Sequence, residues 1–394
     1  MNKRILLYLV ALCAFMGPFT QTIYTPLLPE VQTELHTTQL LINLTISVFT
    51  VVLALMQIVY GPLTDLKGRR YVLLPGIALY VLATIGCAFS HSIYVLLVFR
   101  GFQAAGIATG SVVATTVIGD LFSGKERGRA MGTFQMMVSL GAVAGPLIGG
   151  YIGAQAGFNG VFWVLAGVGS ALLMSIAFLL PETKSQESSG DRFTVKSFAV
   201  ILRHPTGLSV ILLGFIQYYT FYNFLVFLPD ILSRYYSLGI EEKSLVFLPL
   251  SLAIAVGSFI GGRLQERIEP RRSLILTSSL NVASVVLFLL LAKLSLGLLI
   301  LSIFLFGLCL GLSLPVQTTL LTASFVRERA TAIGVYNFFR YMGMAAGPMV
   351  GTVLYRGGVS VLYGVAAVLF ALTVWLASRK LSGAAEGVSP SGAK

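Results

Sequence analysis

Long runs of apolar residues, separated by short polar connections, follow one another along the 394 residues of the chain. A helix that crosses a membrane needs about 20 mostly apolar residues, because the hydrocarbon core of a bilayer is about 30 Å thick. The pattern predicts twelve such helices, over approximately 5–28, 39–63, 71–90, 93–118, 130–153, 158–180, 206–229, 244–263, 273–293, 296–322, 330–355 and 359–378. We therefore expect an all-α membrane protein.

One connection is long and polar, and it separates the first six predicted helices from the last six. It covers residues 182–205, and the apolar spacing of its second part is typical of a short helix at a membrane surface. We predict an N-terminal six-helix bundle over 1–181, this cytoplasmic linker, a C-terminal six-helix bundle over 206–380, and a disordered cytoplasmic tail over 381–394.

The composition excludes several classes of protein. Charged residues make up 11% of the chain, hydrophobic residues 56%, and the mean hydropathy is +0.87. A soluble domain has about 25% charged residues, so this chain has too few to cover a water-exposed surface. An ordinary cytosolic enzyme, a disordered chain and a secreted disulfide scaffold are all excluded, which leaves a helical membrane protein.

The net charge of +12 is an orientation signal. Most of the 27 Lys and Arg residues fall in connections that share one side of the predicted membrane. Basic connections face the cytoplasm, and an even number of helices then places both termini there. We expect a multi-pass protein of the cell inner or plasma membrane, with membrane lipid and no nucleic acid as a partner.

The two halves of the chain repeat each other. Residues 126–153 match residues 328–355 at a constant offset of 202, with identical Glu-Arg and Gly-Pro pairs. Because the repeat begins after an even number of helices, the halves have the same topology in the membrane. This is the arrangement of two bundles around an axis along the membrane normal, with a binding site between them.

The connection after the second predicted helix carries a dense basic cluster, in the segment GPLTDLKGRR. Gly68 provides the backbone angles that a short turn needs. Arg69 and Arg70 need a nearby carboxylate to offset their repulsion. Asp65 and Asp120 are the two candidates.

Two further motifs lie inside predicted helices. Arg100 lies in the fourth helix, where a charge costs about 2.5–3.5 kcal/mol on insertion scales, so it must face protein or water. A packing role bonded to carbonyls is the alternative to a functional one. In the fifth helix, glycines at every fourth position form a smooth stripe for close helix contact, and a proline can bend the helix. These residues are Gly141, Gly145, Pro146 and Gly149.

The three motifs resemble those of the major facilitator superfamily. The pattern G-x-L-x-D-x-x-G-R-R begins at Gly61, a segment similar to R-x-x-Q-G-x-G begins at Arg100 with Ala104 in place of its first glycine, and G-x-x-x-G-P-x-x-G-G begins at Gly141. Over residues 1–380 the chain looks like a twelve-span drug:proton antiporter of that superfamily. The resemblance implies the major facilitator fold with two pseudo-symmetric bundles, proton-coupled export by alternating access, and a role for Arg100 in proton coupling.

Polar and aromatic residues inside the predicted helices are candidates for the substrate cavity, with lipid-facing or core packing as the alternative. They are Gln21, Tyr24, Asn43, Gln103, Gln135, Gln217, Tyr218, Tyr222, Asn223, Gln317, Asn337, Phe338, Arg340 and Tyr341.

The chain departs from many relatives in one respect that bears on the substrate. Where they carry an acid in the first helix, this chain has Thr22, and its acids are all predicted at the membrane ends or outside. With Arg100 and Arg340 inside, neutral or anionic amphipathic substrates fit better than cations. The candidate proton carriers are Asp65, Asp120, Glu30 and Asp230, and we prefer the last two.

Other functions are weighed against export. A uniporter or importer of a small nutrient and a lipid-linked flippase are alternatives of the same fold, and the glycine stripe opposes the importer. We expect no enzyme, cofactor or metal site, because the sequence shows no nucleophile triad, ligand cluster or phosphate-binding loop. We expect a monomer.

Overall fold

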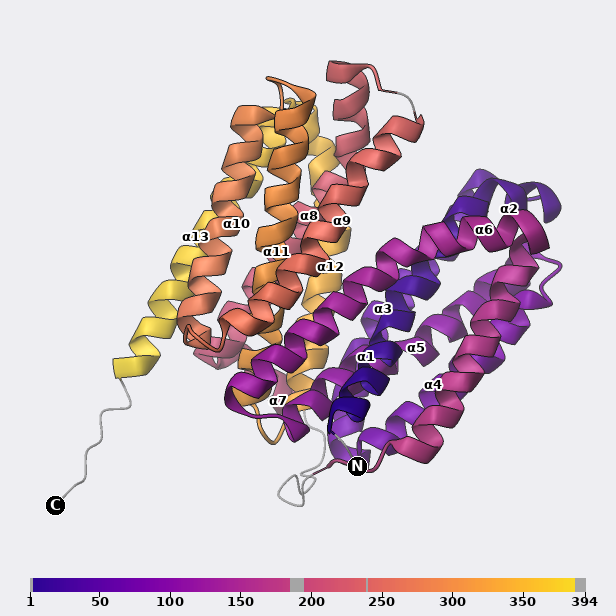
Figure 1. Ribbon diagram of the computed structural model, residues 1–394, viewed down its shortest axis with the longest axis horizontal. Coiled ribbons are helices and arrows are strands. Elements are labelled where there is room, and N and C mark those ends of the chain that lie inside the picture. The colour runs from indigo at the N-terminus through magenta and orange to yellow at the C-terminus, as the bar shows by residue number, and fades with distance from the viewer. Residues whose placement is uncertain (1–2, 185–194, 239, 387–394) are drawn as a thin grey trace. The chain divides into compact units, whose positions relative to one another are not determined.

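The computed structural model describes residues 3–184, 195–238 and 240–386, and every regular element in them is a helix (Figure 1). The chain folds into two compact units. Unit 1 comprises Met1–Ser123, Thr133–Phe193 and Arg327–Gly334, and unit 2 comprises Gly124–Gly132, Thr194–Val326 and Val335–Lys394. Each unit therefore contains a short segment from the other half of the sequence.

The helices of unit 1 come from the first half of the chain. They are α1 (Lys3–Thr22), the 3-10 helix η1 (Thr25–Leu27), α2 (Leu28–Glu34), α3 (Gln39–Lys67), α4 (Arg69–Ala88), α5 (Ile93–Leu121) and most of α6 (Gly124–Leu179). Unit 2 contains α7 (Val195–Arg203), α8 (Pro205–Tyr236), α9 (Ile240–Leu264), α10 (Pro270–Leu291), α11 (Leu296–Ser324), most of α12 (Arg329–Tyr355), and α13 (Val359–Glu386).

Ten helical segments among the described residues are long and apolar enough to cross a membrane. One of them is α6, whose 56 residues are about twice the length that one crossing needs. Its helix is interrupted at Gly157, where φ is 62° and ψ is −174°, so it contains two crossings. The helix α12 is 27 residues long and carries several polar residues in its middle. The predicted all-α membrane fold with twelve helices is confirmed.

Two predicted boundaries were wrong in detail. The first helix was expected over 5–28, but α1 ends at Thr22 and the chain continues through η1 and α2. Pro26 has no backbone donor, which explains a break at this point. The predicted helices 130–153 and 158–180 are joined by the kink at Gly157 rather than by a loop.

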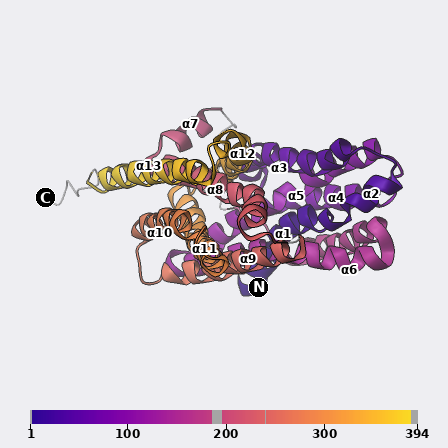
Figure 2. The same ribbon diagram turned by 90° about the horizontal axis from the view of Figure 1, so that it is seen from above.

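The helices pack in the same order in both units. In unit 1, α5 contacts α3 and α4, and in unit 2 its counterpart α11 contacts α9 and α10 (Figures 1 and 2). The tight turn between α3 and α4 depends on Gly68, whose φ of 107° lies in the region that favours glycine. This turn places the basic cluster directly at the start of α4.

Unit 2 has a dense aromatic core. The Phe224 ring lies 4.7 Å from Phe288, 4.5 Å from Phe306 and 4.6 Å from Tyr363, and all four side chains are buried. These residues come from α8, α10, α11 and α13. Aromatic rings at such distances contribute stabilisation beyond their buried area, so the core fixes these four helices together.

The remaining segments of the prediction fall partly outside the described residues. In the predicted linker 182–205, α7 forms the amphipathic helix, and residues 185–194 lie outside the described part of the chain. In the predicted tail 381–394, α13 continues to Glu386, and residues 387–394 are not described.

Candidate functional site

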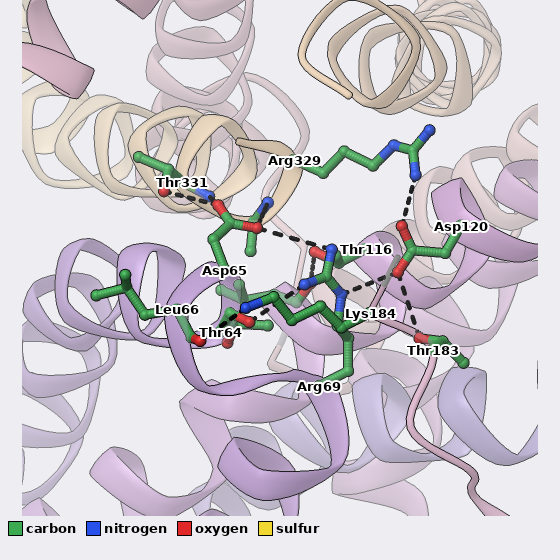
Figure 3. A network of polar contacts seen from close by, with 12 residues as sticks. Thr64, Asp65, Leu66, Arg69, Thr116, Asp120, Thr183, Lys184, Arg329 and Thr331 are labelled. Atoms are coloured by element: carbon green, nitrogen blue, oxygen red, sulfur yellow. Dashed lines mark hydrogen bonds and ion pairs between the residues drawn. The ribbon is translucent and has the colours of Figure 1, made fainter. Parts of the chain in front are cut away.

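An ion-pair network in unit 1 joins the basic turn to two other segments (Figure 3). Asp120, near the end of α5, accepts a hydrogen bond of 2.9 Å from Arg69 Nε through one oxygen and of 2.5 Å from Arg329 Nη1 through the other. The Arg69 side chain is 1% exposed and the Asp120 side chain 6%. Both candidate carboxylates therefore lie beside the basic cluster, because Arg69 pairs with Asp120 and also lies 3.8 Å from Asp65.

Asp65 has a second role at the start of α12. Its carboxylate accepts hydrogen bonds from the backbone amides of Ala330 and Thr331, at 3.2 and 2.8 Å, and from Thr331 Oγ1 at 2.8 Å (Figure 3). The first amides of a helix lack partners within the helix, and a carboxylate there also complements the helix dipole. Gly61 allows this approach, because a Cβ at Gly61 would lie 2.9 Å from the Ala330 oxygen.

The sequence analysis missed three charged residues of this network. Glu182 accepts hydrogen bonds from the amides of Arg69 and Arg70 at 2.9 and 3.1 Å, and Lys184 donates to the Leu66 oxygen at 2.9 Å. Arg329, at the start of the second repeat, is the third. Only its match with Arg127 in the repeat could have drawn attention to it, because partners more than 200 residues away leave no local signal.

Arg100 lies at the centre of a buried polar cluster in unit 1, which we call the Arg100 cluster. Arg100 Nη1 donates to Gln103 Oε1 at 2.7 Å, and the guanidinium lies 4.4 Å from the Phe49 ring and 5.3 Å from the Tyr24 ring. Gln103 in turn donates to Thr84 Oγ1 at 2.8 Å. Two predicted cavity residues, Tyr24 and Gln103, therefore contact the predicted functional arginine.

The charge of Arg100 is not neutralised within the described residues. The side chain is completely buried, its Nε and Nη2 atoms have no hydrogen-bond partner, and no carboxylate lies within ion-pair distance. Burying a charge without a counter-ion is costly, and aromatic faces recover only part of that cost. Such a cation is able to attract an anion or the negative end of a polar group.

A second buried arginine lies among tyrosines in unit 2, and we call this group the Arg340 cluster. The Arg340 guanidinium lies 4.7 Å from the Tyr218 ring and 5.6 Å from both the Tyr336 and Tyr341 rings. Arg340 is 8% exposed, and its Nε has no hydrogen-bond partner. Tyr222 is half-buried near the same group. Tyr336 was not among the predicted cavity residues.

A chain of hydrogen bonds extends from the Arg340 cluster. Tyr336 Oη donates to Gln317 Oε1 at 2.6 Å, Gln317 Nε2 donates to Gln217 Oε1 at 2.6 Å, and Gln217 Nε2 donates to Ser313 Oγ at 2.7 Å. Both glutamines are completely buried. The predicted residues Gln217 and Gln317 are therefore joined to the arginine through Tyr336.

The predicted glycine stripe packs against the first helix of its own unit. A Cβ at Gly141 would lie 2.5 Å from the Phe15 oxygen, and Cβ atoms at Gly145 and Gly149 would overlap Thr22 and Ile23. Thr22 Oγ1 also donates to the Ala142 oxygen of α6 at 3.3 Å. The stripe, with Pro146 inside it, therefore holds α6 in direct backbone contact with α1, at the position where relatives carry an acid.

The repeat forms the same contact in unit 2. A Cβ at Gly343 would overlap the Phe215 oxygen, one at Gly347 would lie 2.6 Å from the Tyr219 oxygen, and one at Gly351 would overlap Asn223. Asn223 thus packs against α12, and its carbonyl accepts a 3.2 Å hydrogen bond from Tyr363.

The other predicted residues are more scattered. Gln21 donates to Thr50 Oγ1 at 2.9 Å, Gln135 is buried, and Asn43 is exposed. Asn337 is buried, and Phe338 packs against the neighbouring Phe339 ring at 5.5 Å.

The two preferred proton carriers differ in their surroundings. Asp230 accepts hydrogen bonds from Tyr355 Oη at 2.6 Å and from Arg234 Nε at 2.7 Å, and its side chain is 39% exposed. Glu30 lies exposed on α2. Asp65 and Asp120 are engaged in ion pairs and hydrogen bonds in this conformation.

Comparison with known proteins finds similar sequences and similar solved structures. "Citrate exporter 1" of Aspergillus niger is 36% identical over 182 residues, which are 46% of this chain and 35% of that protein. The matched part therefore spans about a third of that relative's length. "Multidrug transporter QDR2" of Candida glabrata is 28% identical over 296 residues, or 65% of this chain and 51% of that protein. An uncharacterised transporter of Bacillus subtilis, YdgK, is 28% identical over 81% of both chains.

Solved structures support the fold. The human organic anion transporter MFSD10 has a TM-score of 0.80 at 18% sequence identity, and its match covers 96% of this chain and all of that one. The Escherichia coli fucose:proton symporter FucP has a TM-score of 0.78 at 14% identity, with 95% of this chain covered and 98% of that one. The sequence profile of the Major Facilitator Superfamily matches residues 10–215 and 210–392. The chain belongs to this superfamily of multi-pass membrane transporters.

Proposed function

We propose that this protein exports small amphipathic organic compounds in exchange for protons, and that it prefers anionic and neutral compounds to cations. The transport would proceed by alternating access, as in a drug:proton antiporter. The observation that carries the proposal is the buried, uncompensated charge of Arg100, supported by Arg340 in the other unit.

The sign of the buried charge supports the preference for anions. The four carboxylates considered for coupling lie near helix ends, and Asp65 and Asp120 are occupied by arginines and backbone amides. A cationic drug would find no free acid in the described helix interiors and would meet Arg100 or Arg340. An anion would find a desolvated guanidinium, where electrostatic interactions are stronger than in water.

The glycine stripe and the relatives support the direction of transport. In resembling exporters a glycine-proline stripe occupies the fifth helix, and here it forms a backbone contact between α6 and α1. Two similar proteins are named as a citrate exporter and a multidrug transporter. The positive-inside rule places the basic ends of the helices in the cytoplasm. An exporter takes its substrate from that side.

For proton coupling we favour Asp230. Its carboxylate accepts from Arg234 Nε on the same helix and from Tyr355 Oη on α12, so protonation would weaken both bonds, and the second of them joins α8 to α12. A group whose protonation changes a contact between helices can link proton binding to a conformational change. Glu30 is the second candidate.

Binding to purified protein tests the charge preference. Tetraphenylborate and tetraphenylphosphonium have nearly the same shape and opposite charge, so a difference between them reports charge alone. We expect tetraphenylborate to raise the thermal unfolding temperature in a saturable way, and we expect the response to fall in Arg340→Gln. Stronger stabilisation by tetraphenylphosphonium would overturn the proposed preference.

A further inference from the structure

A pocket in unit 2 lies where the second half of the chain carries a degraded copy of the basic-turn motif. Its volume is about 430 Å³, which is within the range of small-molecule sites. Its walls come from the start of α6, the turn between α9 and α10, and the end of α11. We call it the α9–α10 pocket.

The internal repeat relates this pocket to the Asp120 network. Gly61 matches Gly261, so Gln265 occupies the position of Asp65. Thr115-Thr116 match Thr318-Thr319, so Ala323 occupies the position of Asp120. If the repeat is instead aligned on Glu126-Arg127 and Glu328-Arg329, the residue that matches Asp120 is Thr322, which is also uncharged. Both carboxylates of the first unit are therefore missing in the second.

The positive charge, by contrast, is retained and increased. Arg127, which matches Arg329, lines the pocket together with Lys125 and Arg267. Neither Lys125 nor Arg267 forms an ion pair with another described residue, and both are exposed. Two acids also line the pocket, but Glu266 pairs with Arg129 at 2.7 Å and Glu269 lies 3.9 Å from Arg272.

Two buried polar atoms in the pocket wall also lack partners. Gln265 is 5% exposed and Thr319 is 4% exposed, and Gln265 Oε1 and Thr319 Oγ1 have no hydrogen-bond partner. A buried polar atom without a partner costs free energy, and a ligand or water that bonds it recovers that cost. The Thr319 hydroxyl is able to donate to an anion, and Gln265 is able to accept from a ligand hydroxyl.

We propose that the α9–α10 pocket binds a small organic polyanion from the side of the membrane that carries the basic connections. The carboxylates of the ligand would take the place that Asp120 fills in unit 1, between Arg127, Lys125 and Arg267. The combination of cations with a free hydroxyl donor and a free amide acceptor fits a hydroxycarboxylate. This binding site is separate from the Arg100 and Arg340 clusters and does not depend on the direction of transport.

Thermal unfolding of the purified full-length protein with citrate as the probe, at constant ionic strength, tests this proposal. We expect a saturable rise in the unfolding temperature. Lys125→Gln and Arg267→Gln should each weaken the apparent affinity about tenfold, the loss expected for one charge-assisted hydrogen bond. Lys380→Gln, which removes an exposed charge on α13, is the matched control and should leave the affinity unchanged.

A variant that restores the missing carboxylate makes the test sharper. Ala323 is exposed, so Ala323→Asp is expected to fold, to unfold at a higher temperature without ligand, and to lose the response to citrate. Arg100→Gln separates this site from a transport site, because it should leave the response intact. Absence of any response to citrate, or a response that persists in Ala323→Asp and in both charge variants, would overturn the proposal. A response lost only in Arg100→Gln would assign citrate to the transport site instead.

Discussion

Arg100 is a buried charge whose surroundings bear on its role. Its side chain is completely buried, two of its nitrogens have no partner, and it contacts aromatic faces and a glutamine instead of a carboxylate. A residue kept only for stability would be expected to have a better-compensated charge, because apolar replacements of buried ions are often neutral or stabilising. Arg100 Nη1 also donates to the Thr20 oxygen at 3.4 Å, a contact that the packing alternative expects, so the functional role of Arg100 stays a prediction.

We predict that Arg100→Gln reduces transport at least about tenfold while the unfolding temperature stays the same or rises, since the variant removes an uncompensated buried charge. Arg100→Lys keeps the charge but loses the planar contact with Phe49 and Tyr24, so it should retain part of the activity. Transport in vesicles and thermal unfolding are measured on the same preparations. A large loss of stability with unchanged transport per folded molecule would identify Arg100 as a packing residue.

At the scale of helices, the glycine stripes of α6 and α12 form the same contact in the two units. Gly149 lies against the Ile23 backbone in one unit, and Gly347 lies against the Tyr219 backbone in the other. Close backbone approach of this kind stabilises helix pairs in membranes, where there is no hydrophobic force between helices. The stripes therefore fix α1 to α6 and α8 to α12.

Two neighbouring glycines allow a matched test of this contact. A Cβ at Gly149 would overlap the Ile23 oxygen, whereas a Cβ at Gly150 meets nothing within 4 Å. Gly149→Ala should therefore destabilise the protein by about 1–3 kcal/mol through overpacking. Gly150→Ala should be neutral or stabilise by about 0.5–1 kcal/mol, because alanine favours a helix. Equal thermal unfolding of the two variants would show that α6 does not pack on α1 in this way.

At the scale of the whole molecule, each unit includes a segment from the other half of the sequence. Residues 327–334 belong to unit 1, where Asp65 and Asp120 hold Ala330, Thr331 and Arg329. Residues 124–132 belong to unit 2, where Arg129 pairs with Glu266. These contacts attach each segment to its unit, so their strength affects the stability of that unit.

The two ion pairs should differ in strength because they differ in burial. Asp120→Asn removes the carboxylate that bonds the buried Arg69 and the nearly buried Arg329, leaves Arg69 with Asp65 at 3.8 Å, and should destabilise the protein by about 3–5 kcal/mol. Glu266→Gln removes the partner of Arg129, which is 59% exposed, and should cost at most about 1 kcal/mol. Thermal unfolding of both variants checks the order. If Glu266→Gln were the more damaging change, our account of the Asp120 network would be wrong.

Much of the fold was predictable because lipid imposes a strong pattern on sequence. The apolar runs predict the helices, and the repeat predicts that α12 resembles α6, since both signals are local or nearly so. The motif residues Asp65 and Arg69 were predictable for the same reason. The pairing of Asp120 with Arg329 and the capping of α4 by Glu182 were not, because they join residues more than 100 positions apart that carry no mutual signature.

The cavity residues illustrate the same limit. Amphipathic character alone could not separate Gln217, which is in the hydrogen-bonded chain to Tyr336, from Asn223, which packs under the glycine stripe. Both are polar residues on α8, six positions apart, and both are buried. Only tertiary contacts distinguish a residue near Arg340 from one at a helix interface. The position of the proton carrier is a prediction for the same reason.

Uptake of a radiolabelled amphipathic organic anion into everted membrane vesicles tests the central claim most directly. In such vesicles an exporter moves its substrate inward while protons leave the lumen. We predict that an imposed acidic lumen accelerates uptake, that collapse of the pH gradient with nigericin abolishes this acceleration, and that Asp230→Asn shows no response to the gradient. Uptake that is unchanged when the gradient is collapsed would contradict the claim that this protein is a proton-driven anion exporter.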